Sequence, residues 1–149
     1  MYSTILWATD GAAGATDALE EAVKLLEPHG RLVAFHAKQM FVGSRAGGLP
    51  VYPDEHERVA RIARQVAKLA DRCINAELWV ESTVQSPVRT IVEAADEVGA
   101  EAIVCSARMH HALLRLLEGS VSSRLIHETS IPVVVVPQTA HHRVRELAR

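Results

Sequence analysis

Two apolar runs separated by a helix start, within residues 102–137, limit the possible folds more than any other feature of this chain. The first run, residues 102–105 (AIVC), has no polar alternation, which is typical of a parallel strand covered on both faces. The second run, residues 131–136 (IPVVVV), comes only after residues 119–122 (GSVS), where glycine and serine favour a helix start. A strand, a crossover helix and a second strand predict a parallel sheet packed against helices.

The same alternation extends along the whole chain. Strand-like apolar runs occur at 4–9, 32–37, 76–83, 101–105 and 131–136. The segments between them carry apolar residues at helical spacing. We therefore expect an α/β protein with three layers, α/β/α, around a five-stranded parallel sheet.

Loop and helix boundaries are also readable. The first helix is expected to stop near Pro28 and Gly30, and residues 38–51 are predicted to form a long loop because they hold Gly43, Gly47, Gly48 and Pro50 with little periodicity. The next helix has one apolar stripe, and its charged residues are predicted to face water. These are Glu57, Arg58, Arg61, Arg64 and Lys68. The pair Ser86-Pro87 predicts the cap and first turn of the helix that ends before Gly99.

Composition restricts the class of protein. The 149 residues, 48% of them hydrophobic, suit one domain with one core. A net charge of -2 provides no general attraction for nucleic acid, and no apolar run is long enough to span a membrane. The start of the chain has no basic, apolar leader, and Cys73 and Cys105 are far apart in sequence. We therefore expect a cytoplasmic protein without disulfides, and no nucleic-acid or membrane partner.

Several short motifs together resemble the universal stress protein family over nearly the whole chain. They are the strand end at residues 8–12 (ATDGA), the pair Gly119-Ser120, and the strand start at residues 131–133 (IPV). In the family's late glycine motif, the first two glycine positions correspond here to Ser106 and Met109. The resemblance implies a Rossmann-like sheet in the order 3-2-1-4-5, a domain over residues 1–138, and a C-terminal tail over 139–149.

The resemblance also implies a nucleotide site, for ATP or AMP with Mg²⁺, at the carboxyl edge of the sheet. The matching positions are Ala8, Thr9, Asp10, Ala37, Cys105, Ser106, Met109, Gly119, Ser120, Val121 and Ser122. Asp10 can accept hydrogen bonds from ribose hydroxyls, and Ala37 can leave room for the base. Amides at the helix start near Ser120 can bind phosphate oxygens.

A purely structural reading of these residues stays open. Asp10 can serve only to order the turn at Gly11, and Ser120 can serve only to cap a helix. Met109 places a long side chain where the family has glycine, which hinders close approach of phosphates. Two functions follow as alternatives: a dimeric, non-catalytic stress-response module with an altered nucleotide pocket, or an ATP/AMP-binding regulatory switch with at most slow hydrolysis.

No catalytic residue or metal ligand is predicted. The paired histidines at 110–111 and 141–142 lack the cysteine, histidine or carboxylate spacing of a metal site. His36 lies on an apolar strand and is interpreted as a packed, hydrogen-bonded side chain. Cys105 has apolar neighbours, which favour an inert buried thiol over a nucleophile.

The fifth strand is expected at an edge of the sheet. Its residues Val133, Val134, Val135 and Val136 would form an apolar edge that invites pairing with another chain. The resemblance implies a homodimer in which fifth strands meet across a twofold axis. The alternative is that the tail from Gln138 to Arg149 covers this edge.

Overall fold

The computed structural model describes residues 1–12, 15–42, 48–107 and 121–138, and in this part strands and helices alternate. The first half of the chain forms β1 (Tyr2–Ala8), α1 (Thr16–Leu25), β2 (Leu26–Val42), β3 (Gly48–Pro50) and α2 (Glu55–Asp71). The second half forms β4 (Asn75–Thr83), α3 (Pro87–Val98), β5 (Ala102–Ala107), α4 (Val121–Glu128) and β6 (Val133–Pro137). The expected tail over 139–149 lies outside the described residues.

The five predicted strands form one parallel sheet in the predicted order. Strand β4 pairs with β2, β2 with β1, β1 with β5, and β5 with β6, all in parallel. This is the order 3-2-1-4-5 when the predicted strands are numbered along the chain. The sixth strand, β3, is an addition that pairs antiparallel with the end of β2. Strand β1 lies at the centre of the sheet.

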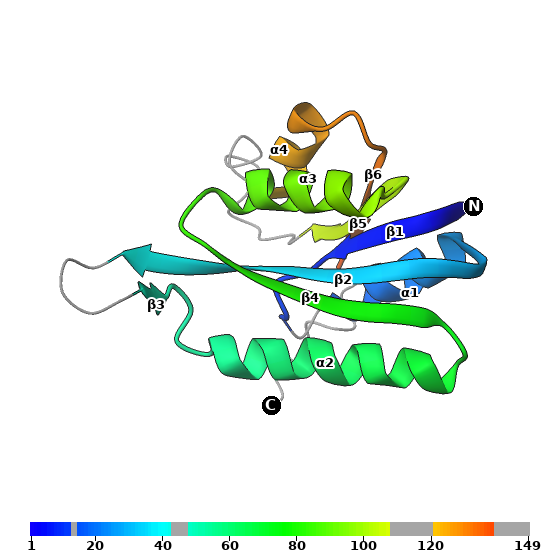
Figure 1. Ribbon diagram of the computed structural model, residues 1–149, viewed down its shortest axis with the longest axis horizontal. Coiled ribbons are helices and arrows are strands. Elements are labelled where there is room, and N and C mark those ends of the chain that lie inside the picture. The colour runs from blue at the N-terminus through cyan, green and yellow to red at the C-terminus, as the bar shows by residue number, and fades with distance from the viewer. Residues whose placement is uncertain (13–14, 43–47, 108–120, 139–149) are drawn as a thin grey trace.

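Helices cover both faces of this sheet (Figure 1), which explains why its strands lack polar alternation. Trp7 of β1 packs on one face, in a cluster with Leu19 of α1 and Ile62 of α2. Its neighbour Leu6 points to the other face and packs with the side of the sheet that α3 and α4 cover, including Leu125. The α/β/α layering expected from the sequence is confirmed.

Within residues 38–51, which were predicted to form a long loop, residues 38–42 and 48–50 are strand. Strand β2 continues to Val42, and β3 returns antiparallel to it, with Met40 opposite Pro50 and Val42 opposite Gly48. The glycine-rich composition indicated a loop, whereas pairing with the returning segment satisfies the backbone of β2 beyond the end of β1. Figure 1 shows this hairpin extending beyond the rest of the sheet.

Helix boundaries mostly agree with the sequence. Helix α1 ends at Leu25, a few residues before Pro28, and β2 begins at the next residue. Pro87 is the first residue of α3, and Gly99 ends that helix with a left-handed φ of 66°. Ser86 occupies the cap position, but its side chain makes no capping hydrogen bond. No helix in the described ranges combines the length and hydrophobicity needed to cross a bilayer.

Candidate functional site

The carboxyl edge of the sheet brings together most of the predicted site residues that are described. Ala8, the last residue of β1, pairs with Phe35 of β2 and with Cys105 of β5. Thr9 and Asp10 follow directly after β1 at this edge. The residues that come next on β2 and β5 lie at the same edge, and they include Ala37 and Ser106.

The start of α4 lies toward the same edge. Because β5 and β6 are parallel, the connecting helix must run back along the sheet, so it begins near the carboxyl end of β5. Val121 and Ser122 are its first two residues. Met109, Gly119 and Ser120 lie outside the described residues, so their positions are not part of this geometry.

Two backbone amides of the turn between β1 and α1 donate hydrogen bonds to side chains of the same turn. The Gly11 amide donates to Thr9 Oγ1 at 3.2 Å, and the Ala12 amide donates to Asp10 Oδ1 at 2.9 Å. Gly11 has a left-handed φ of 70°, which favours glycine. Neither of these two amides is therefore directed at a ligand, and the Asp10 side chain is held in a defined orientation.

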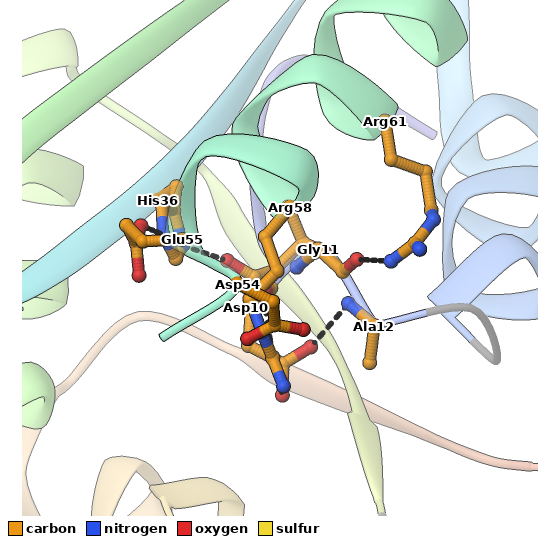
Figure 2. Close-up of polar contacts among 9 residues, drawn as sticks. Asp10, Gly11, Ala12, His36, Asp54, Glu55, Arg58 and Arg61 are labelled. Atoms are coloured by element: carbon orange, nitrogen blue, oxygen red, sulfur yellow. Dashed lines mark hydrogen bonds and ion pairs between the residues drawn. The ribbon is translucent and has the colours of Figure 1, made fainter. Parts of the chain in front are cut away.

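Three consecutive carbonyl groups of this turn accept hydrogen bonds from side chains of other elements (Figure 2). His36 Nδ1 of β2 donates to the Thr9 oxygen at 2.9 Å. From α2, Arg58 donates to the Asp10 oxygen at 3.1 Å, and Arg61 donates to the Gly11 oxygen. The backbone of the turn is thereby fixed by β2 and α2.

Arg58 is itself held by several groups. Its Nε donates to Asp54 Oδ1 at 2.9 Å, and its guanidinium carbon lies 4.3 Å from the centre of the Tyr52 ring. Another nitrogen lies 3.8 Å from Asp10 Oδ2. The hydrogen bond from Arg58 lowers the pKa of Asp54. Only 13% of the Arg58 side chain is exposed, so the prediction that this residue faces water is wrong.

His36, which contacts the turn, forms a buried pair with Glu55. His36 Nε2 is hydrogen-bonded to Glu55 Oε1, and the two side chains are 2% and 3% exposed. The interpretation of His36 as a packed, hydrogen-bonded residue is confirmed. Glu55 is the first residue of α2, so the pair joins the start of that helix to β2.

Cys105 is a buried thiol, as its apolar neighbours indicated. It is 5% exposed, and burial raises its pKa to about 11. Within the described residues there is no group of three or more histidine, cysteine, aspartate or glutamate side chains that could hold a metal ion. The histidine pairs at 110–111 and 141–142 lie outside the described ranges.

The sequence interpretation missed Glu55, Arg58 and Arg61 as contributors to this region. Their charges at helical spacing are typical of a solvated face. One signal was available: a crossover helix between parallel strands begins near the carboxyl edge. The first turns of α2 could therefore be expected at the same edge of the sheet as Asp10.

Comparison with known proteins gives one family and a consistent set of structures. The model of the universal stress protein family matches residues 1–137. A universal stress protein from Archaeoglobus fulgidus DSM 4304 is 22% identical, with a TM-score of 0.66. That alignment covers 93% of this chain and 45% of the other, so this chain spans about half of that protein.

Two further structures match over nearly their whole length. A protein of the universal stress protein family from Burkholderia pseudomallei is 26% identical, with a TM-score of 0.62 and coverage of 91% of this chain and 96% of the other. A universal stress protein in complex with cAMP is 21% identical, with a TM-score of 0.61 and coverage of 93% and 98%. No curated protein matches this chain.

Proposed function

This chain belongs to the universal stress protein family, and on that premise we propose that it is a non-catalytic regulatory module that binds an adenine nucleotide. The proposed site is the carboxyl edge where β1 and β5 end beside β2, bounded by the start of α4. In this proposal the nucleotide acts as a signal and is not turned over. A similar protein solved in complex with cAMP supports a nucleotide as the ligand class.

The observation that carries the proposal is the fixed carboxylate of Asp10 at this edge. One of its oxygens accepts from the Ala12 amide, and its side chain is 36% exposed, so solvent reaches it. An ionised carboxylate is a strong acceptor for the hydroxyl groups of a sugar. Ala37 lies further along β2, and its small side chain leaves space for a base. These residues fit the nucleoside part of a nucleotide.

The described residues offer fewer groups to the phosphates than to the nucleoside. The amides of Gly11 and Ala12 are bound by side chains of their own turn, so they do not form a phosphate cradle. Phosphates would depend on the start of α4, near Val121 and Ser122. The glycine motif that precedes this helix carries Ser106 and Met109 in place of glycines. We therefore propose an altered pocket in which the nucleoside contributes most of the affinity.

The proposal includes a homodimer through β6, in the cytoplasm. Strand β6 is the last strand of the described sheet order, so its outer edge has no partner among the described strands. An apolar edge of this kind favours pairing with a second copy of the same strand. Cys73 and Cys105 are both free thiols, which is typical of a reducing compartment.

Calorimetric titration with adenosine, AMP and ATP tests the nucleotide proposal. We expect saturable binding of all three, with AMP and ATP within about threefold of each other, because the phosphates contribute little. D10A should weaken binding of each ligand about tenfold. D96A is a matched control, since Asp96 is an exposed carboxylate on α3. Absence of saturable heat with all three ligands would leave only the dimeric interaction module.

A turnover assay tests the non-catalytic part. The purified protein incubated with ATP and Mg²⁺ should release no more ADP than the D10A variant. Release that requires Asp10 and rises in proportion to protein concentration would contradict it and would favour a slow hydrolase.

A further inference from the structure

Arg58 contacts the turn that carries Asp10 in two separate ways. Its backbone oxygen and Cβ pack so closely on Gly11 that a Cβ added there would lie 2.7 Å and 2.8 Å from them. Its guanidinium donates to the Asp10 carbonyl oxygen and lies 3.8 Å from Asp10 Oδ2. The first contact depends on the helix backbone, and the second depends on the side chain alone.

The side-chain contact fixes Asp10 from both ends. The Ala12 amide holds Oδ1 at 2.9 Å, and the Arg58 guanidinium attracts Oδ2 and holds the carbonyl of the same residue. An aspartate on an exposed turn would otherwise sample several rotamers and would have to be ordered when a ligand binds. With Arg58 present, this ordering is complete before binding.

The position of Arg58 is in turn determined by groups outside the turn. Asp54 accepts from Nε, and the Tyr52 ring lies beside the guanidinium. These contacts leave the guanidinium little freedom to move toward a bound phosphate. They direct its charge at Asp10.

We propose that Arg58 is a positioning residue for the nucleotide site and that it acts on ligand binding through the carboxylate of Asp10. This inference rests on the proposed function for its ligand and on the geometry of the turn for its mechanism. It assigns to α2 a role in the site that the strand ends alone do not provide.

The test uses R58A, which keeps the backbone and Cβ that pack on Gly11 and removes the rest of the side chain, including the guanidinium. Affinities for adenosine and AMP should both fall, by about fivefold to tenfold, because both ligands carry the ribose hydroxyls. R58K should recover part of the loss, since it restores the charge beside Asp10. R72A is the matched control: Arg72 follows the end of the same helix and pairs with Glu20 at 2.8 Å on the surface.

A double-mutant cycle decides whether Arg58 acts through Asp10. In the D10A background, R58A should cause no further loss of affinity. If R58A weakens AMP much more than adenosine, or weakens binding equally with and without the Asp10 carboxylate, then Arg58 contacts the ligand directly and the proposal is wrong.

Amide hydrogen exchange separates this proposal from the proposed function. Without any ligand, R58A should accelerate exchange of the Ala12 amide about tenfold, because its acceptor on Asp10 then lacks the contact with the guanidinium. Amides of α3 should be unchanged. If the unaltered protein binds neither adenosine nor AMP, the proposed function fails, and the Ala12 exchange rate still decides whether Arg58 positions Asp10. An unchanged rate overturns the positioning role.

Discussion

His36 and Glu55 share one proton in the core of the protein. The Thr9 carbonyl has no proton to give, so His36 Nδ1 must donate to it. A neutral histidine would then present a lone pair at Nε2, and an ionised Glu55 would present another at Oε1. The hydrogen bond between these two atoms therefore requires one proton, and the pair as a whole is neutral.

Replacing one partner of this pair should destabilise the protein unequally. H36F leaves the Glu55 carboxylate buried without a partner, and we expect a loss of about 3 to 5 kcal/mol in the free energy of unfolding. E55Q should cost less, about 1 to 2 kcal/mol, because its amide can donate to His36 Nε2. Urea unfolding measures both. R89A is the control, since its exposed pair with Glu93 should contribute less than about 1 kcal/mol. An H36F variant as stable as R89A would contradict the prediction.

Two glycines provide a matched comparison of backbone strain and packing. Gly11 and Gly99 have φ angles of 70° and 66°, yet only Gly11 has atoms within 4 Å of an added Cβ. G99A should cost about 1 kcal/mol from the left-handed backbone alone. G11A should cost about 3 kcal/mol or more, because Arg58 must also move. Equal losses in thermal or urea unfolding would show that α2 does not clamp the turn.

The two thiols should differ strongly in reactivity. Burial raises the pKa of Cys105 from 9.0 to about 11, so at pH 8 only about one molecule in a thousand carries a thiolate there. Cys73 is exposed. Iodoacetamide should therefore modify Cys73 and leave Cys105 unmodified, as peptide mass analysis would show. Rapid modification of Cys105 in the native protein would contradict its burial.

The raised pKa of Cys105 also makes the stability of the folded protein depend on pH in one direction. A folded pKa raised above that of the unfolded chain gives stability below pH 9 that is lost as the pH rises toward 11. C105A should therefore lose less stability than the unaltered protein between these pH values. Comparison of the two unfolding curves at several pH values cancels the tyrosine and lysine contributions that both proteins share. Parallel losses would contradict the assignment.

Dimer formation through β6 can be tested at one backbone position. Ile103 donates to the Pro132 oxygen and Gln138 donates to the Ala107 oxygen, so by strand alternation the amide of Val135 points away from β5. V135P should therefore leave the β5–β6 ladder intact and reduce the dimer fraction in sedimentation velocity. V136P removes an amide that faces β5 and should lower stability. A folded V135P variant that remains fully dimeric would exclude this edge as the interface.

The sequence predicted the sheet because its evidence is local and repeated. Apolar runs such as residues 102–105 need no partner to be recognised, and the crossover rule then places them in parallel. The hairpin of β2 and β3 was missed because the glycines within residues 43–48 indicate a loop, whereas its pairing depends on two segments that meet only in the folded chain. Local composition does not report that pairing.

For the site, the position of Asp10 followed from the strand order, but its partners did not. Arg58 and Arg61 are indistinguishable by pattern from Arg64, because all three are charged positions of one amphipathic helix. Arg58 and Arg61 differ from Arg64 in that they reach the turn, and this depends on how α2 lies against the sheet.

The three donors that hold the turn come from β2 and α2, which are themselves parts of the core. Detaching the turn therefore means breaking contacts that also hold the sheet to its helix. Its opening should coincide with loss of the whole native structure and should not occur as a local fluctuation. A ligand at this edge would therefore meet a backbone surface that keeps its shape for as long as the domain stays folded.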